Sequence, residues 1–89
     1  MKFTWDPKKR LTNLKKHDLD FFDAERVFSG HTVTFPDNRF RYEEMRFITV
    51  GLLEERVVAI AHTEIENTIR IFSMRAGERY ERELYFTSF

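Results

Sequence analysis

The stretch Val57-Val58-Ala59-Ile60-Ala61 is apolar at every position, and it decides the fold. A strand that is apolar on both faces is typical of the centre of a sheet covered on two sides. Further strands are expected at about residues 46–53 before it and 68–74 after it. The breaks at Glu54-Glu55 and Glu66-Asn67 are short enough to predict antiparallel hairpins.

Outside these strands, the β-branched segment 32–35 predicts one more strand, and residues 2–5 can add an edge strand. Asp6 is a good helix N-cap and Pro7 suits the first helical position, so a helix is expected from there to His17. Asp18 should take a left-handed conformation, and Asp20 should cap a second helix that ends near residues 29–30. We expect these two helices to form an antiparallel hairpin.

A last helix is predicted over about residues 75–85, with Tyr80 and Leu84 facing inward and Arg75, Arg79 and Arg82 on the opposite stripe. The predicted fold class is therefore α+β, with an N-terminal helical hairpin on an antiparallel β-sheet and a C-terminal helix. Residues 1–89 are long enough for a single domain only.

Composition excludes several functional classes. The chain has no cysteine, so disulfides, thiolate catalysis and Cys-based zinc sites are excluded. No apolar run is long enough for a membrane span, and the first residues lack the apolar core of a signal peptide, so the expected location is cytoplasmic, with no membrane partner. We also expect no cofactor and no metal, because the three histidines lie far apart and neither a Gly-rich phosphate loop nor a metal-ligand motif is present.

Charge is zero overall but unevenly distributed. Residues 1–17 carry six Lys or Arg against one Asp, residues 18–45 carry three against seven acids, and residues 70–89 carry four against three. A local basic patch can bind phosphate in a neutral protein if both basic ends of the chain meet. The available Arg, Lys, Glu, His and Tyr side chains suit attack by a ribose 2′-hydroxyl on its own phosphodiester, which implies RNA as substrate.

Two patterns leave alternatives open. Lys9, Asn13 and Lys16 lie on one stripe of the first helix, which is either an ordinary solvated face or an anion-binding surface. In the last hairpin, a three-residue loop would place His62 opposite Arg70 on one face of the sheet, whereas a two-residue loop would pair Thr63 with Arg70 and put His62 on the other face.

Motifs spread over nearly the whole chain resemble the BrnT family of toxins. They are Trp5-Asp6-Pro7, Lys9, Asn13, Lys16-His17, Phe21, Ala24, Phe28, Glu44-x-Arg46, Gly51, His62-Thr63-Glu64, Ile69-Arg70-Ile71, Ser73-Met74-Arg75, Glu81 and Tyr85. The resemblance implies a RelE-like fold and an endoribonuclease that inhibits translation within a type II toxin–antitoxin system. It also implies a BrnA-like ribbon-helix-helix antitoxin, so that DNA is contacted only through that partner.

The chain departs from the family pattern at two positions. Asp18 replaces a common Gly after the Lys-His pair, which a left-handed turn tolerates. Ala76 replaces a basic residue after Arg75. Either Arg79 supplies the missing charge or the activity is weakened, and an inactive homologue that binds its antitoxin as a co-repressor is the alternative function.

Eight residues are the predicted site. Arg75 would contact phosphate, His62 would transfer a proton, Glu44 would act as base, and Lys16 would add positive charge to the catalytic group. The predicted substrate-binding residues are Arg46, Arg70, Arg79 and His17. The hypothesis requires that Lys16 and Arg75 meet in space.

Overall fold

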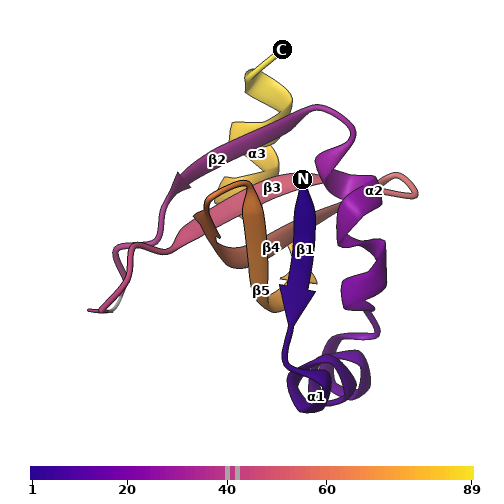
Figure 1. Cartoon of the computed structure of the whole chain (residues 1–89). Coiled ribbons are helices and arrows are strands. Elements are labelled where there is room, and N and C mark those ends of the chain that lie inside the picture. The colour runs from indigo at the N-terminus through magenta and orange to yellow at the C-terminus, as the bar shows by residue number, and fades with distance from the viewer. Residues whose placement is uncertain (40, 42) are drawn as a thin grey trace.

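The computed structural model describes residues 1–39, 41 and 43–89. Within them, five strands form one sheet in the order β1-β5-β4-β3-β2 (Figure 1). The strands are β1 (Lys2–Trp5), β2 (Thr32–Pro36), β3 (Phe47–Leu53), β4 (Arg56–Ile65) and β5 (Thr68–Ala76). The helices are α1 (Pro7–His17), the 3₁₀ turn η1 (Phe21–Asp23), α2 (Ala24–Phe28) and α3 (Arg79–Thr87). No helix in the described residues is long and apolar enough to cross a membrane.

β4 lies in the centre of the sheet, as its apolar run predicts. It pairs antiparallel with β3 and β5, and each hairpin has a two-residue turn. Both turn pairs, Glu54-Glu55 and Glu66-Asn67, have positive φ at each residue, which matches the twist of the flanking strands. The two-residue alternative for the last hairpin is therefore the one observed, and Thr63 pairs with Arg70.

The predicted arrangement of the sheet and its N-terminal helices is wrong. Residues 2–5 form β1, which pairs in parallel with β5, so the sheet is mixed and the chain begins with a strand. The segment before α2 starts as a 3₁₀ turn, and α1 packs along β5 while α2 lies against β3. No N-terminal helical hairpin forms, because pairing of β1 with β5 draws α1 to the edge of the sheet.

The ends of α1 agree with the prediction. The Asp6 carboxylate accepts a hydrogen bond from the Lys8 backbone N–H at 2.8 Å, and Pro7 occupies the first turn. Asp18 ends the helix in the left-handed conformation, with φ 56°. An ion pair links this short helix to the next segment, because the Arg10 guanidinium donates to both oxygens of Asp20 at 2.8 and 2.9 Å.

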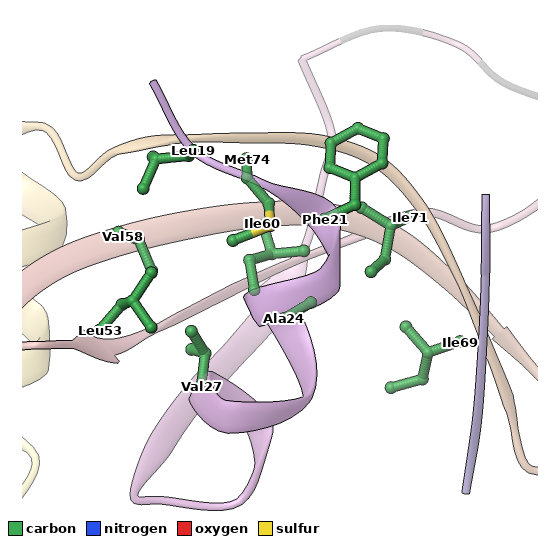
Figure 2. Close-up of a cluster of buried hydrophobic side chains, with 10 residues drawn as sticks. All are labelled: Leu19, Phe21, Ala24, Val27, Leu53, Val58, Ile60, Ile69, Ile71 and Met74. Carbon is green, nitrogen blue, oxygen red and sulfur yellow. The ribbon is translucent and has the colours of Figure 1, made fainter. Parts of the chain in front are cut away.

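Two apolar clusters cover the two faces of the sheet. The first lies beneath η1 and α2 and is drawn in Figure 2; it contains Leu19, Phe21, Ala24, Val27, Leu53, Val58, Ile60, Ile69, Ile71 and Met74. The second lies beneath α3 and contains Ile48, Val50, Val57, Ala59, Ala61 and Tyr85. Figure 1 shows α2 and α3 on opposite sides of the sheet. Alternate residues of β4 thus enter alternate clusters, as expected for a central strand.

The C-terminal helix begins later than predicted and turns a different face inward. Arg75 and Ala76 belong to β5, and α3 starts at Arg79. Tyr80 and Leu84 are 52% and 39% exposed, whereas Tyr85 is buried on this helix. The single stripe of arginines is therefore wrong, because the first of them lies on a strand.

Candidate functional site

Part of the α3 face of β5 is left uncovered by the helix, which packs over β2, β3 and β4. Ile69, Ile71 and Met74 point into the cluster on the other face. The strand bulges between Ile71 and Ser73, because Ile71 pairs with His62 while Ser73 pairs with the preceding residue of β4. This irregularity leaves Phe72 without a ladder partner, and Phe72 packs toward the α3 side. Alternation places Arg70 and Arg75 on that same side.

Helix α1 runs beside the second half of β5, and Asn13 joins the two. The Asn13 side-chain amide donates to the Met74 carbonyl oxygen at 2.9 Å and accepts from the Met74 N–H at 3.1 Å. It also donates to the Leu19 carbonyl oxygen at 3.1 Å. Asn13 is buried, so its role is structural although it belongs to the predicted polar stripe. Its hydrogen bonds hold the helix that carries Lys9 and Lys16 beside the strand.

Arg75 is fixed by a buried carboxylate. Its two terminal nitrogens donate to the two oxygens of Glu81 at 2.7 and 3.0 Å, and Glu81 is fully buried. Glu81 also accepts from the Glu78 backbone N–H at 2.8 Å in a capping box at the start of α3. The Tyr80 hydroxyl donates to it at 3.3 Å.

These contacts shift the pKa values of both groups. Burial alone would raise the pKa of Glu81, but the hydrogen bonds from Arg75 and from the Glu78 N–H outweigh it, so the pKa is lowered. The hydrogen bond to Glu81 raises the pKa of Arg75. Both groups are therefore charged at neutral pH.

The hydrogen bonds of Asn13 to Met74 hold α1 beside the end of β5. Partial burial lowers the pKa of His17, and the positive charges of Lys16 and Arg75 lower it further. The positive charge of Arg39 opposes the rise in the pKa of Arg75. The Arg39 guanidinium itself donates to both oxygens of the buried Asp37 at 2.8 and 3.0 Å. His17 is thus a half-buried imidazole within a cationic cluster, and it is mostly neutral near pH 7.

Arg46 and Glu44 form a pair beside this cluster. The Arg46 Nε atom donates to Glu44 at 3.1 Å, and the guanidinium lies 3.9 Å from the centre of the Phe72 ring. The Lys9 ammonium lies 5.1 Å from the same ring centre. Arg46 and Glu44 also line an open depression of about 270 Å³ in the segment between β2 and β3.

His62 lies in the interior on the α2 side of the sheet. It is 2% exposed and packs against the rings of Phe28 and Phe47. Its Nε2 atom lies 2.6 Å from the Thr49 hydroxyl and its Nδ1 atom lies 3.3 Å from the Thr63 carbonyl oxygen. The carbonyl can only accept, so Nδ1 carries the proton and Nε2 accepts from Thr49. Burial lowers the pKa of His62, which favours this neutral form.

The other two predicted site residues lie at the surface. Arg70 is exposed and lies opposite Thr63, away from His62. Arg79 is 87% exposed on its side chain, and its guanidinium contacts Glu83 at 3.2 Å. The structure therefore places α1, with Lys16 and His17 in its last turn, beside the strand that carries Arg75, and it pairs Arg46 with Glu44. His62 lies on the other face of the sheet, and Arg79 contacts Glu83 at the surface.

Sequence reasoning missed three members of this site. Arg39 and Phe72 had no distinguishing local pattern. Glu81 had one signal, because Glu78 and Glu81 have the spacing of a capping box at a helix start. That signal places the first turn of the helix after Glu78 rather than at Arg75.

The arrangement suits chemistry on a phosphodiester. Lys16 and His17 end the helix that packs beside β5, and Arg75 lies on that strand, so these elements offer cations for phosphoryl oxygens and an imidazole that can accept a proton. Within the described residues, no group of three or more His, Asp or Glu side chains is placed to hold a metal ion.

Comparison with known proteins agrees with this chemistry. A search of curated proteins gave no match. The family described as "Ribonuclease toxin, BrnT, of type II toxin-antitoxin system" matches residues 5–81, which include α1, the whole sheet apart from the first residues of β1, and Glu81. The chain therefore belongs to the BrnT family of ribonuclease toxins of type II toxin–antitoxin systems.

Proposed function

We propose that Lys16, His17 and Arg75 are the catalytic centre of a metal-independent endoribonuclease. The observation that carries this proposal is the pair of hydrogen bonds between Asn13 and Met74, which fixes α1, with Lys16 and His17 in its last turn, beside the end of β5 that carries Arg75. A neutral imidazole next to two cations can accept a proton and sit close to a bound phosphate. These are the two properties that attack by a 2′-hydroxyl requires.

The guanidinium of Arg75 retains an unused edge. Glu81 takes one N–H from each terminal nitrogen, and the Ala76 carbonyl oxygen accepts from Nη1 at 3.3 Å. A guanidinium has five N–H donors in a planar fork. The Nε–H and the second Nη2–H make no hydrogen bond to the described residues, and this edge has the geometry that binds two phosphoryl oxygens at once.

The proposed reaction is a transesterification within the RNA. His17 takes the proton of the ribose 2′-hydroxyl, and the 2′-oxygen attacks the adjacent phosphorus. The bond from phosphorus to the 5′-oxygen breaks, and that oxygen takes a proton from a water molecule. The resulting hydroxide takes the proton from His17, and the products are a 2′,3′-cyclic phosphate and a 5′-hydroxyl. Arg75 and Lys16 stabilise the negative charge that develops on the phosphoryl oxygens.

The pure protein with RNA tests this mechanism. Cleavage should persist in EDTA, and loss of cleavage in EDTA would contradict metal independence. His17→Gln should lower the rate by about 10²–10⁴-fold. In the parent protein the rate should rise with pH up to a plateau, since His17 must be neutral, and this acid limb should disappear in the variant. His31→Gln is the control, because His31 stacks on Phe89 next to α3.

Lys16 and Lys15 provide a second matched pair. Both are exposed in the last turn of α1, and removing either changes the net charge equally. Lys16→Gln should lower cleavage by about tenfold, the effect of one phosphate contact, while Lys15→Gln should change it little. Equal losses in the two variants would mean that cleavage depends on the net charge of the protein rather than on a specific phosphate contact by Lys16.

His62 and Glu44 have other roles in this proposal. His62 is buried and fully hydrogen-bonded on the opposite face of the sheet, so we assign it to the core. Glu44 holds Arg46 by an ion pair. His62→Gln should therefore lower the free energy of unfolding and leave the pH dependence of cleavage unchanged.

We further propose that the RNA cleavage inhibits translation in the cytoplasm and that a BrnA-like ribbon-helix-helix antitoxin neutralises it. An acidic segment of that partner would complement the cluster around Lys16 and exclude RNA. DNA would be contacted by the antitoxin alone. Antitoxin binding should therefore weaken in Lys16→Gln relative to Lys15→Gln, and excess RNA should compete with it.

The alternative function is a weakly active or inactive toxin that serves as an antitoxin-binding co-repressor. Two observations favour it: Arg75 is already neutralised by Glu81, and the exposed position 76 is Ala. Induction of the toxin alone separates the two functions. Arrested growth supports the ribonuclease, whereas normal growth with abundant soluble protein supports the co-repressor.

A further inference from the structure

We infer that Lys9, Arg46 and Phe72 form a second RNA subsite, which binds the backbone phosphate of a nucleotide near the one that is cleaved. This inference rests on the proposed ribonuclease centre at Arg75. It concerns a separate part of the same open face, and none of these three residues takes part in the proposed reaction.

The first observation is that one aromatic ring holds two cations. The Arg46 guanidinium lies 3.9 Å and the Lys9 ammonium 5.1 Å from the centre of the Phe72 ring. An electron-rich ring attracts a cation that lies over its face. The Phe72 ring therefore helps to hold both cations in place before any anion arrives.

The second observation is the local charge. Among the ion pairs of the described residues, Glu44 is the acidic partner of Arg46, and Lys9 takes part in none. The group of Lys9, Arg46 and Glu44 therefore keeps one net positive charge. Lys9 is exposed, and the Arg46 side chain keeps 24% of its surface accessible. Both cations are therefore accessible to a phosphate from solvent.

The third observation is alignment with the proposed catalytic centre. Lys9 and Lys16 are seven residues apart on α1, so they lie on the same side of the helix about 10 Å apart. Phe72 and Arg75 are three residues apart on β5, which is also about 10 Å. Successive phosphates of one nucleic-acid strand are about 3.4 Å apart along the axis of a duplex and farther apart in an extended strand. About one to three nucleotides therefore cover this distance.

The bulge in β5 places the subsite and Arg75 on one face of the sheet. Phe72 follows Ile71, which points into the other cluster, so Phe72 lies on the α3 side by alternation. The extra residue shifts the alternation after it by one position, so Arg75 lies on the same side as Phe72 although the two are three residues apart. Single-stranded RNA is the class of ligand that fits, because its successive phosphates can contact Arg75 and the two cations around Phe72 at separate points along β5.

The test compares Lys9→Gln with Lys8→Gln on RNA substrates of two lengths. Both lysines are exposed in the first turn of α1, and both variants lose one charge. With an RNA of ten nucleotides, Lys9→Gln should lower kcat/KM by about threefold to tenfold through KM, and should reduce the salt slope by about 0.7. With a dinucleotide it should match the parent protein, and Lys8→Gln should match the parent in both cases.

Equal losses in the two variants, or an equal loss with the dinucleotide and the longer RNA, would overturn the subsite. If the parent protein cleaves neither RNA, the proposed function fails, and binding to a 2′-O-methyl RNA of ten nucleotides then tests the subsite separately. Lys9→Gln should bind it more weakly than Lys8→Gln, and equal affinities would overturn the inference. Phe72→Leu, which keeps an apolar side chain but removes the ring, should reproduce the Lys9→Gln loss in a variant shown to be folded.

Discussion

Replacing Glu81 with Gln removes the charge that holds Arg75 while keeping the shape of the side chain. Glu81 is fully buried and accepts hydrogen bonds from Arg75, from the Glu78 N–H and from the Tyr80 hydroxyl. In the variant, the amide oxygen can still accept from Glu78, but the amide nitrogen faces a guanidinium N–H. Arg75 is left as a half-buried cation without its partner.

The cost follows from this geometry. Breaking a buried ion pair by removing one partner costs about 3–5 kcal/mol. The Arg75 side chain is 19% exposed, so water can compensate part of the loss, and the retained oxygen keeps one hydrogen bond. We therefore expect the free energy of unfolding to fall by about 2–3 kcal/mol.

Urea unfolding at pH 7 measures the loss, and a double-mutant cycle with Arg75→Gln assigns it to the pair. Each single variant should lose about 2–3 kcal/mol, and the double variant should lose about as much as one of them. The pKa of Glu81 is lowered in the folded state, so its contribution is complete above about pH 4.5 and is lost as the pH falls further. Glu81→Gln should lack this acid loss. Additive losses, or a loss below about 1 kcal/mol in Glu81→Gln, would refute the reasoning.

Three further changes test the fold. The pKa of His62 is lowered by burial, so the unfolded chain binds the proton first and stability should fall as the pH drops below about 6.5; urea unfolding from pH 8 to 5 should show a smaller loss in His62→Gln. Gly51→Ala should cost about 1–3 kcal/mol in the same assay, because the new Cβ atom would lie 2.7 Å from a neighbouring side chain, whereas at Gly30 the nearest atom is at 3.8 Å and Ala should be tolerated. Replacing Glu54-Glu55 with Asn-Gly should raise the thermal midpoint and add about 1 kcal/mol, because both positions have positive φ.

Local patterns were sufficient for the strands and for the ends of α1. The run 57–61 is apolar on both faces, and only a central strand can bury such a run. The two-residue breaks around β4 allow only tight hairpins. Asp6, Pro7 and Asp18 act through their own backbone geometry, so their effects need no knowledge of distant residues.

Long-range pairing was not readable in the same way. Nothing in residues 2–5 indicates that they pair with β5 rather than remain separate, yet that pairing places α1 at the sheet edge. The extent of β5 also depends on distant partners, because Arg75 pairs with Ala59 and Met74 bonds to Asn13. The helical spacing of the arginines after residue 74 was therefore misleading.

The relation between His62 and the arginines shows why a site depends on register. A two-residue turn puts His62 and Arg70 on different faces of the sheet, and the later bulge then shifts the pairing by one residue. Periodicity can indicate that a strand exists, but it cannot reveal one extra residue in the ladder. His17 was assigned to substrate binding alone because the position of α1 beside β5 arises only in the folded chain.

The edge of the guanidinium that meets a carboxylate decides what each arginine can do. Arg10 and Arg39 use Nε and Nη2 to bind their aspartates, which occupies the edge that would receive a phosphate. Arg75 instead presents its two terminal nitrogens to Glu81. Its orientation is fixed while its Nε edge stays available, so Glu81 can hold the cation without competing for the same donors. Since that carboxylate also cancels the charge of Arg75, the net attraction for an RNA phosphate at this corner must come mainly from Lys16.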